Sequence, residues 1–252
     1  MAVRKALVLL AVMLSGCVTT GDIDPMKTTE GRERARDAFI ELGIGYLERG
    51  ASEQAKAPLQ QALDLDPKSA NAHMALALAF QHELEHTLAE KHFKQAIASE
   101  PGNSRLLNNY AGFLFEQQRY ADAHAVFLKA SEDTMYSERS RVFENLGLTA
   151  LQLNEKGSAK HYFTRALRLN SQQPRALLEL ADLAFQEQDF VTARSYYEGF
   201  TQLSAHSARS LLLGVRLANV FDDRSTAASL GLQLRRLYPG TVQYQQYLSE
   251  LK

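Results

Sequence analysis

One short stretch of the sequence carries side chains at a spacing that could do chemistry. Residues 82–86 read His-Glu-Leu-Glu-His and fit the pattern H-E-x-x-H. On one continuous helix this spacing puts His82 and His86 a turn apart, where both imidazoles can bind zinc while Glu83 activates a water molecule. A zinc-dependent hydrolase is therefore one function to weigh. The decision depends on whether a single helix carries all three residues.

A second reactive side chain is Cys17, the only cysteine in the 252-residue chain. A basic start and an apolar stretch at 6–14 precede it, which is typical of a secretory signal peptide too short to span a membrane. Residues 14–17, Leu-Ser-Gly-Cys, resemble a bacterial lipobox, whose cysteine is acylated and becomes the new N-terminus. The lone cysteine has no partner for a disulfide. We therefore expect a signal peptide at 1–16 and lipidation at Cys17; the alternative is an ordinary secreted protein with an incidental cysteine.

The elements that must position these residues follow a period of 34 residues, which is the signature of a solenoid. One alanine per period marks the repeat, with a single interval of 36, at Ala55, Ala89, Ala123, Ala159, Ala193 and Ala227. The period predicts a repeat domain at 36–252, with repeats at 36–69, 70–103, 104–137, 140–173, 174–207 and 208–241 and a capping helix at 242–252. Residues 17–35 are expected to form the lipidated N-terminus and a tether.

Small and large residues recur at fixed positions within each repeat, so that two helices can pack closely. Position 8 is small at Gly43, Ala77, Ala111, Gly147 and Ala181, and larger residues occupy positions 7, 11 and 24. This pattern resembles the tetratricopeptide repeat (TPR), which implies an all-α superhelical solenoid of helix-turn-helix repeats. The sixth repeat departs from it at positions 7, 8 and 24, with Gly214, Val215 and Gly231.

The repeat register bears directly on the zinc hypothesis. It places the turn between the two helices of the second repeat inside the interval from His82 to His86, so the imidazoles would not share a helical face. No third zinc ligand, Gly-rich phosphate loop or nucleophile elbow is evident in the sequence. We therefore expect no enzyme activity, no metal and no cofactor.

In TPR proteins the first helix of each repeat lines a concave groove. Carried over position by position, this groove is unusually apolar here, at Ile40, Ile44, Leu47, Met74, Leu78, Phe115, Leu148, Leu151, Leu178, Phe185 and Leu212. An apolar strip that is open to water usually marks a partner site. The alternative is that strong superhelical curvature or the tether covers part of the strip.

Arginine occupies position 2 in four successive repeats, at Arg105, Arg141, Arg175 and Arg209. Such a ladder could hold the carboxylates or carbonyls of an extended peptide. It could equally pair within the protein, for example with Glu116, Glu144 or Asp182. The Lys and Asn residues with which chaperone-binding TPRs clamp a terminal carboxylate are not reproduced, since Ile40 and Ile44 stand at two of those positions.

The charge balance argues against some classes of partner. Without residues 1–16, which contain Arg4 and Lys5, 26 basic residues remain against 29 acidic ones, a net charge of −3. A nearly neutral chain gives no reason to expect nucleic acid, and nothing indicates a small-molecule substrate.

A lipobox, a short tether and about six TPRs in a chain of this length together resemble the type IV pilus biogenesis and stability lipoproteins, the PilF/PilW family of pilotins. The resemblance implies an outer-membrane lipoprotein on the periplasmic face. It would bind subunits of the PilQ-type pilus secretin and promote their localisation and multimerisation. The alternatives are a TPR lipoprotein scaffold for peptidoglycan enzymes or the β-barrel assembly machinery and, in a different class, the zinc hydrolase.

Overall fold

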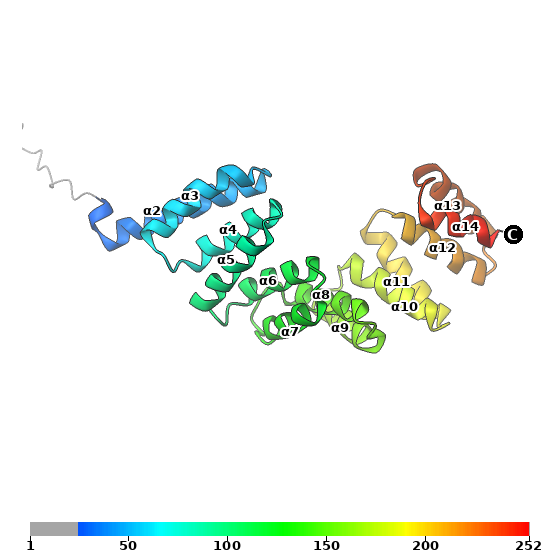
Figure 1. Cartoon of the computed structure of the whole chain (residues 1–252). Coiled ribbons are helices and arrows are strands. Elements are labelled where there is room, and N and C mark those ends of the chain that lie inside the picture. The colour runs from blue at the N-terminus through cyan, green and yellow to red at the C-terminus, as the bar shows by residue number, and fades with distance from the viewer. Residues whose placement is uncertain (1–24, 252) are drawn as a thin grey trace, which may run out of the picture. The chain divides into compact units, whose positions relative to one another are not determined.

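The computed structural model describes residues 25–251, and over that range it consists of helices and turns, which confirms the all-α solenoid of TPR hairpins. The chain divides into two units, one ending at Ser99 and the other beginning at Glu100. Each unit is described by itself. Figure 1 shows that both are built from pairs of antiparallel helices.

The N-terminal unit contains two helical hairpins, preceded by a single 3-10 turn at Pro25–Lys27. Its helices are α2 (Thr29–Glu48), α3 (Ser52–Leu65), α4 (Ala70–His82) and α5 (His86–Ser99). The helices pack in the order of the chain, α2 on α3, α3 on α4 and α4 on α5, and α2 also contacts α4.

The C-terminal unit contains four hairpins and a final single helix. Its helices are α6 (Ser104–Glu116), α7 (Tyr120–Ser131), α8 (Arg139–Gln152), α9 (Lys156–Leu169), α10 (Pro174–Gln186), α11 (Phe190–Leu203), α12 (Ala208–Val220), α13 (Arg224–Leu237) and α14 (Val242–Glu250). The first helix of one repeat also contacts the first helix of the next, as in α6 with α8, α8 with α10 and α10 with α12. These first helices therefore share one face within the unit.

The turn inside every hairpin is made the same way. One residue per repeat has a positive φ of 55–72°, at Gly50, Leu84, Gln118, Asn154, Gln188 and Asp222. All six stand at position 15 of the repeats expected from the sequence, and the turn in the sixth has the same form as the others. A left-handed residue ends the first helix and reverses the chain within a few residues, which makes the two helices antiparallel.

Close packing inside a hairpin depends on the small residue at position 8. A Cβ atom built on Gly43 would lie 2.5 Å from Leu59 Cγ, and one built on Gly147 would lie 2.5 Å from the Phe163 ring. Leu59 and Phe163 stand at position 24 and are completely buried. The large residue of the second helix therefore fills the space that the first helix leaves open.

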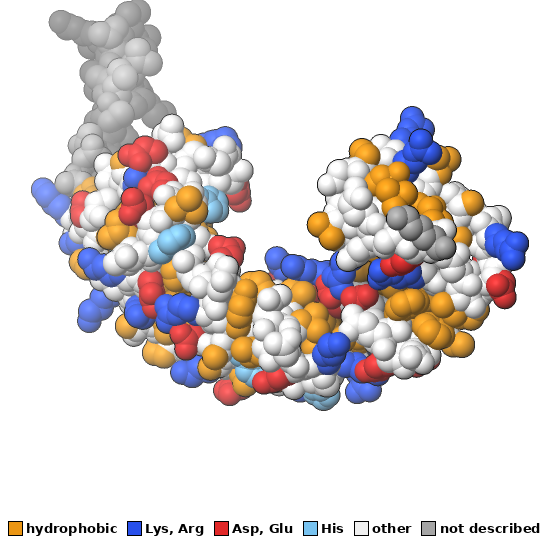
Figure 2. All heavy atoms as spheres, turned by 45° about the vertical axis from the view of Figure 1, so that its right-hand side comes forward, with side chains coloured by type: hydrophobic (Ala, Val, Ile, Leu, Met, Phe, Trp, Pro, Cys, Tyr) orange, Lys and Arg blue, Asp and Glu red, His pale blue; other side chains and the backbone are white. Residues whose placement is uncertain are grey.

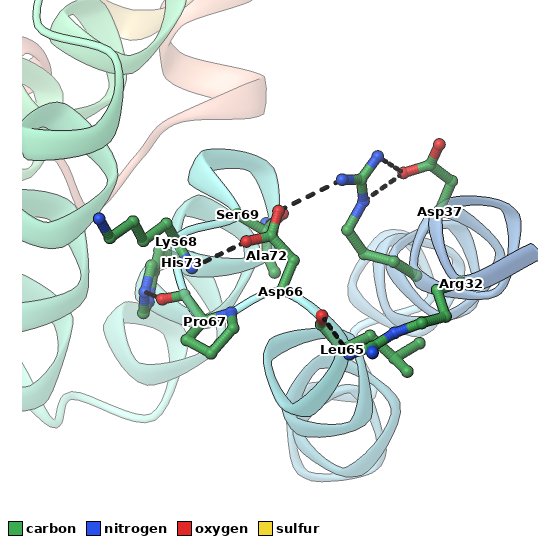
Figure 3. Close-up of polar contacts among 10 residues, drawn as sticks. Arg32, Asp37, Leu65, Asp66, Pro67, Lys68, Ser69, Ala72 and His73 are labelled. Atoms are coloured by element: carbon green, nitrogen blue, oxygen red, sulfur yellow. Dashed lines mark hydrogen bonds and ion pairs between the residues drawn. The ribbon is translucent and has the colours of Figure 1, made fainter. Parts of the chain in front are cut away.

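Helix α2 differs from expectation at its start. It begins at Thr29, inside the segment expected to be a tether, because the Thr28 hydroxyl caps it by accepting a hydrogen bond from the Gly31 amide at 3.0 Å. The extra turns are held to the α3–α4 connection. Figure 3 shows Arg32 and Asp66 in this network, in which the Arg32 guanidinium donates to the Leu65 carbonyl at 3.3 Å. These contacts make the added turns part of the folded unit.

The last helix, α14, closes the C-terminal end of the second unit. Tyr244 and Tyr247 pack on the apolar cluster of α12 and α13. A Cβ atom on Gly231 would lie 2.2 Å from the Tyr247 hydroxyl. The glycine that departs from the TPR pattern thus makes room for this helix, and a bidentate ion pair between Arg216 and Glu250 holds it in place.

Candidate partner-binding surfaces

The H-E-x-x-H stretch does not lie on one helix. Helix α4 ends at His82, Leu84 has a φ of 61°, and α5 begins at His86. The His82 ring hydrogen-bonds the Ser52 hydroxyl at 3.3 Å, and the Glu83 carboxylate accepts from Lys56 at 3.0 Å. Over residues 25–251, no group of three or more His, Cys, Asp or Glu side chains is placed to hold a metal ion. His82 and Glu83 therefore connect neighbouring hairpins.

The apolar positions predicted for the groove divide into two groups. Ile40, Met74, Leu148 and Leu212 are buried in the core, with at most 9% of each exposed, so a partner would reach little of them. The others are half-buried and retain surface for a contact, namely Ile44, Leu47, Leu78, Phe115, Leu151, Leu178 and Phe185. Large parts of the expected strip are thus used for packing helix on helix.

The N-terminal unit has an apolar surface that the sequence pattern did not single out. Leu42 stands at position 7 of the first repeat and is 47% exposed, whereas its equivalents Leu76 and Leu180 are at most 3% exposed. Those two leucines pack on the second helix of the preceding repeat. In the described residues no earlier repeat supplies such a second helix before the first repeat, so Leu42 lacks this cover.

The C-terminal unit has a cavity of about 330 Å³ on the shared face of α6, α8 and α10. It is lined by Gly112, Phe115, Glu116, Phe127, Asn145, Leu148 and Arg175. Gly112 stands at position 9, where Ile44, Leu78 and Leu148 stand in other repeats, and the missing side chain leaves the cavity open. Gly112 and Asn145 were not predicted as site residues, although a glycine at a groove position was a readable signal.

The four arginines of the ladder do not have the same surroundings. Arg209 binds the Glu179 carboxylate through two hydrogen bonds of 2.5 and 2.8 Å and reaches Asp182 at 2.7 Å. These carboxylates raise the pKa of Arg209 above its usual range. Arg141 pairs with Glu138 at 3.2 Å in an exposed contact, and Arg105 is exposed on α6. Arg209 is therefore a structural residue in this fold.

Arg175, at the start of α10, is different. Its side chain is exposed and makes no hydrogen bond or ion pair with another residue of the described range. It attracts the carboxylate of Glu144, whose pKa is nevertheless raised because burial outweighs this attraction. A guanidinium in this position is available to a carboxylate or carbonyl from outside.

Arg175 also lines a second and larger cavity, of about 620 Å³. This cavity lies between the loop before α8 and the loop before α10, and its polar lining includes Arg141, Glu144, Asn170 and Gln173. The two residues by which the sequence exceeds the 34-residue period, 138 and 139, lie where the first of these loops meets α8. One free guanidinium thus lines both cavities, each of which has polar and apolar walls. Figure 2 shows hydrophobic side chains beside charged ones over the middle repeats.

Comparisons with known proteins agree with this architecture. Two family models described as tetratricopeptide repeat match the chain, one at residues 40–86 and 145–208 and the other at 85–135. The type IV pilus assembly protein PilF of Pseudomonas aeruginosa is 58% identical over 251 residues, which cover 99% of this chain and all of PilF.

Solved structures show the same relationship. The structure of Pseudomonas aeruginosa PilF superposes with a TM-score of 0.86 at 57% identity, covering 87% of this chain and 99% of that one. PilW, described as a widely conserved type IV pilus biogenesis factor, superposes with a TM-score of 0.73 at 27% identity, covering 84% and 98%. The TPR protein YrrB, at 16% identity and a TM-score of 0.61, shares the fold.

Proposed function

This chain belongs to the PilF/PilW family of TPR proteins of type IV pilus biogenesis, and on that premise we propose that it acts as a pilotin. In this role it is anchored by lipid in the outer membrane and faces the periplasm. It holds subunits of the PilQ-type pilus secretin and promotes their localisation and multimerisation. It works as a scaffold, without a cofactor.

The anchor is proposed from the sequence, because Cys17 lies outside the described residues. Two or three acyl chains, at about 0.8 kcal/mol per buried methylene, attach a protein stably to a bilayer. Within the described part of the chain, no helix is both long and apolar enough to cross a membrane. In this proposal the lipid at Cys17 supplies the membrane address and the repeats bind the partner.

The observation that carries the binding proposal is the position of Arg175. Its free guanidinium lines both the cavity that contains Phe115 and Leu148 and the cavity that contains Arg141. An extended secretin segment fits this arrangement if an apolar side chain enters the first cavity and an acidic side chain reaches the arginines. Half-buried Ile44 and Leu78 of the N-terminal unit offer a second apolar contact.

A deletion strain tests the proposal. The deletion strain is complemented with the wild type, Cys17→Ser, Arg175→Glu or Arg168→Glu. The assay measures the amount of heat- and detergent-resistant secretin multimers in the outer membrane, relative to total secretin. Arg168 is exposed on α9 and lines neither cavity, so it is the matched control. We expect Cys17→Ser to leave the fold intact but lose the outer-membrane location and the multimers.

The Arg175→Glu protein should remain in the outer membrane, but the amount of secretin multimers should fall. The Arg168→Glu strain should contain as many multimers as the wild type. Normal multimers in the deletion strain would remove secretin assembly from the function. Affinity capture from membranes would then ask whether peptidoglycan enzymes or the β-barrel assembly machinery bind instead. Cys17→Ser protein that remains in outer-membrane fractions would contradict the anchor.

A further inference from the structure

The second helices of the last three repeats each end in an exposed leucine. Leu169 ends α9, Leu203 ends α11 and Leu237 ends α13, and they are 49%, 40% and 58% exposed. All three stand at position 30 of the repeat. One exposed leucine needs no explanation, but the recurrence puts a leucine at the same end of three successive second helices.

Leu203 and Leu237 precede two loops that contact each other. The Tyr238 hydroxyl donates a hydrogen bond to the His206 carbonyl at 2.8 Å, which joins the loop after α13 to the loop after α11. Val242 begins α14 at the end of the later loop and is 68% exposed. Exposed apolar side chains therefore gather along the edge where α11 and α13 end and α14 begins.

Two arginines stand beside these side chains. Arg235 and Arg236 are exposed in the last turn of α13, and neither makes a hydrogen bond or ion pair with another described residue. Basic residues at the C-terminal end of a helix suit the helix dipole, but an exposed leucine gains nothing from it. The two guanidinium groups are therefore available to an anion that lies next to an apolar surface.

The charge of this edge differs from that of the opposite edge of the same repeats. Residues 202–207 and 235–243 contain two arginines and neither aspartate nor glutamate. The first turns of α12 and α14, which begin at this edge, contain no acidic residue either. The turns at the opposite edge, inside the hairpins, contain Glu187, Asp189, Asp222 and Asp223. An anionic surface would therefore be attracted to the first edge and repelled by the second.

We infer that the edge formed by Leu203, Leu237, Val242, Arg235 and Arg236 is a docking surface for an anionic phospholipid bilayer. The apolar side chains gain free energy by leaving water for the boundary between headgroups and acyl chains, and the guanidinium groups bind phosphate at the depth of the headgroups. A bilayer offers both chemistries at every point of its surface, so it requires no shaped groove.

This surface is separate from the proposed secretin site. Leu169 is left out of it because that leucine lines the larger of the two Arg175 cavities. The contact does not require a lipid at Cys17, so it goes beyond the proposed function. In a lipid-anchored protein it would hold the C-terminal unit against the bilayer.

Tryptophan fluorescence tests the contact, because the chain contains no tryptophan. The chain from residue 17, which retains every described residue, is made with Cys17→Ser so that no acyl chain contributes. Leu237→Trp supplies the reporter. Vesicles of phosphatidylethanolamine and phosphatidylglycerol should shift its emission to the blue, and brominated acyl chains should quench it. Val191→Trp is the matched control, because Val191 is 68% exposed near the start of α11, at the opposite edge. Its emission should not change.

Vesicle binding by arginine variants measures the contribution of charge. Arg235→Gln/Arg236→Gln should weaken binding to the same vesicles about 25-fold, since each basic residue near an anionic membrane contributes about fivefold. Arg224 lies at the other end of α13, about 20 Å away, which exceeds the Debye length of about 10 Å at about 0.1 M salt. Arg224→Gln should therefore bind within about twofold of the wild type. All these arginines are exposed, so the variants should unfold at the temperature of the wild type.

Three results would overturn the inference. The first is unchanged emission of Leu237→Trp on addition of vesicles, or an equal blue shift in Val191→Trp. The second is equal vesicle affinity of the wild type and Arg235→Gln/Arg236→Gln. The third is a blue shift that grows with protein concentration when no vesicles are present, because the edge would then be a contact between copies of this chain. These assays contain no secretin, so failure of the proposed function would leave their results unchanged.

Discussion

Replacing Arg209 by alanine should destabilise the fold, whereas the same change at Arg175 should not, although both stand at position 2 of a repeat. Arg209 makes two hydrogen bonds to Glu179 and one to Asp182, and Glu179 is only 7% exposed. Truncating Arg209 leaves that carboxylate buried without its cation. Removing one partner of a fully buried pair costs about 3–5 kcal/mol.

The expected cost is smaller here because the Arg209 side chain is 42% exposed and solvent screens part of the interaction. We expect a loss of about 2–3 kcal/mol of unfolding free energy after this discount. For a domain of this size that is a fall of about 4–12 °C in the unfolding temperature. Arg175→Ala has no such pair to break and should change the unfolding free energy by less than about 0.5 kcal/mol.

Calorimetry and urea unfolding of the two variants measure this difference. Arg209→Lys should fall between wild type and Arg209→Ala, because an ammonium group keeps the charge but cannot form the two parallel bonds to Glu179. The double variant Arg209→Ala/Glu179→Ala should recover part of the loss, since it leaves no unpaired carboxylate at position 179. Equal stability of Arg209→Ala and Arg175→Ala would refute the division of the ladder into structural and available arginines.

Three further predictions concern packing, pH and the apolar contact. Gly147→Ala should lower the free energy of unfolding by about 1–3 kcal/mol, because the added methyl group overpacks against the next helix. Gly45→Ala has open space around it and should raise the free energy of unfolding by about 0.5–1 kcal/mol. The urea midpoints of the two variants check both signs. Burial lowers the pKa of His92 to about 4. As the pH falls, the unfolded chain therefore binds a proton at this histidine before the folded chain does. The free energy of unfolding should fall by up to about 3 kcal/mol from pH 6.5 to 4. His92→Phe should flatten that decline, and an unchanged slope would contradict the assignment. Ile44→Asp and Leu78→Asp should weaken secretin co-purification while the circular dichroism spectrum stays helical; unchanged capture would remove these residues from the site.

Much of the fold could be predicted because the repeat is a local pattern. The spacing of small and large residues determines where two helices can approach, so the positions of Gly43 and Gly147 predicted the hairpins. The same register predicted the turn between His82 and His86, which separates the two histidines. Residues 29–35 were expected to belong to the tether, but they form the first turns of α2. These turns are attached to the fold by the hydrogen bond from Arg32 to the Leu65 carbonyl, which no local pattern shows.

The candidate site was predictable only in part. Position in the repeat identified Arg175 and Phe115 as surface residues of the first helices, but it assigned buried Ile40 and Met74 to the same face. Exposure at such positions depends on how closely neighbouring hairpins pack. Leu42 shows the opposite case, since it is exposed because the described chain has no earlier repeat whose second helix would cover it.

The sequence by itself determined the all-helical repeat, its register and the break inside the H-E-x-x-H stretch, because residues within one 34-residue unit set each of these. Only the tertiary structure decided that Arg209 is paired while Arg175 is free. These properties depend on side chains from different repeats meeting in space. A pattern that repeats along the chain predicts where such residues stand, and the packing of one hairpin on the next determines what each of them contacts.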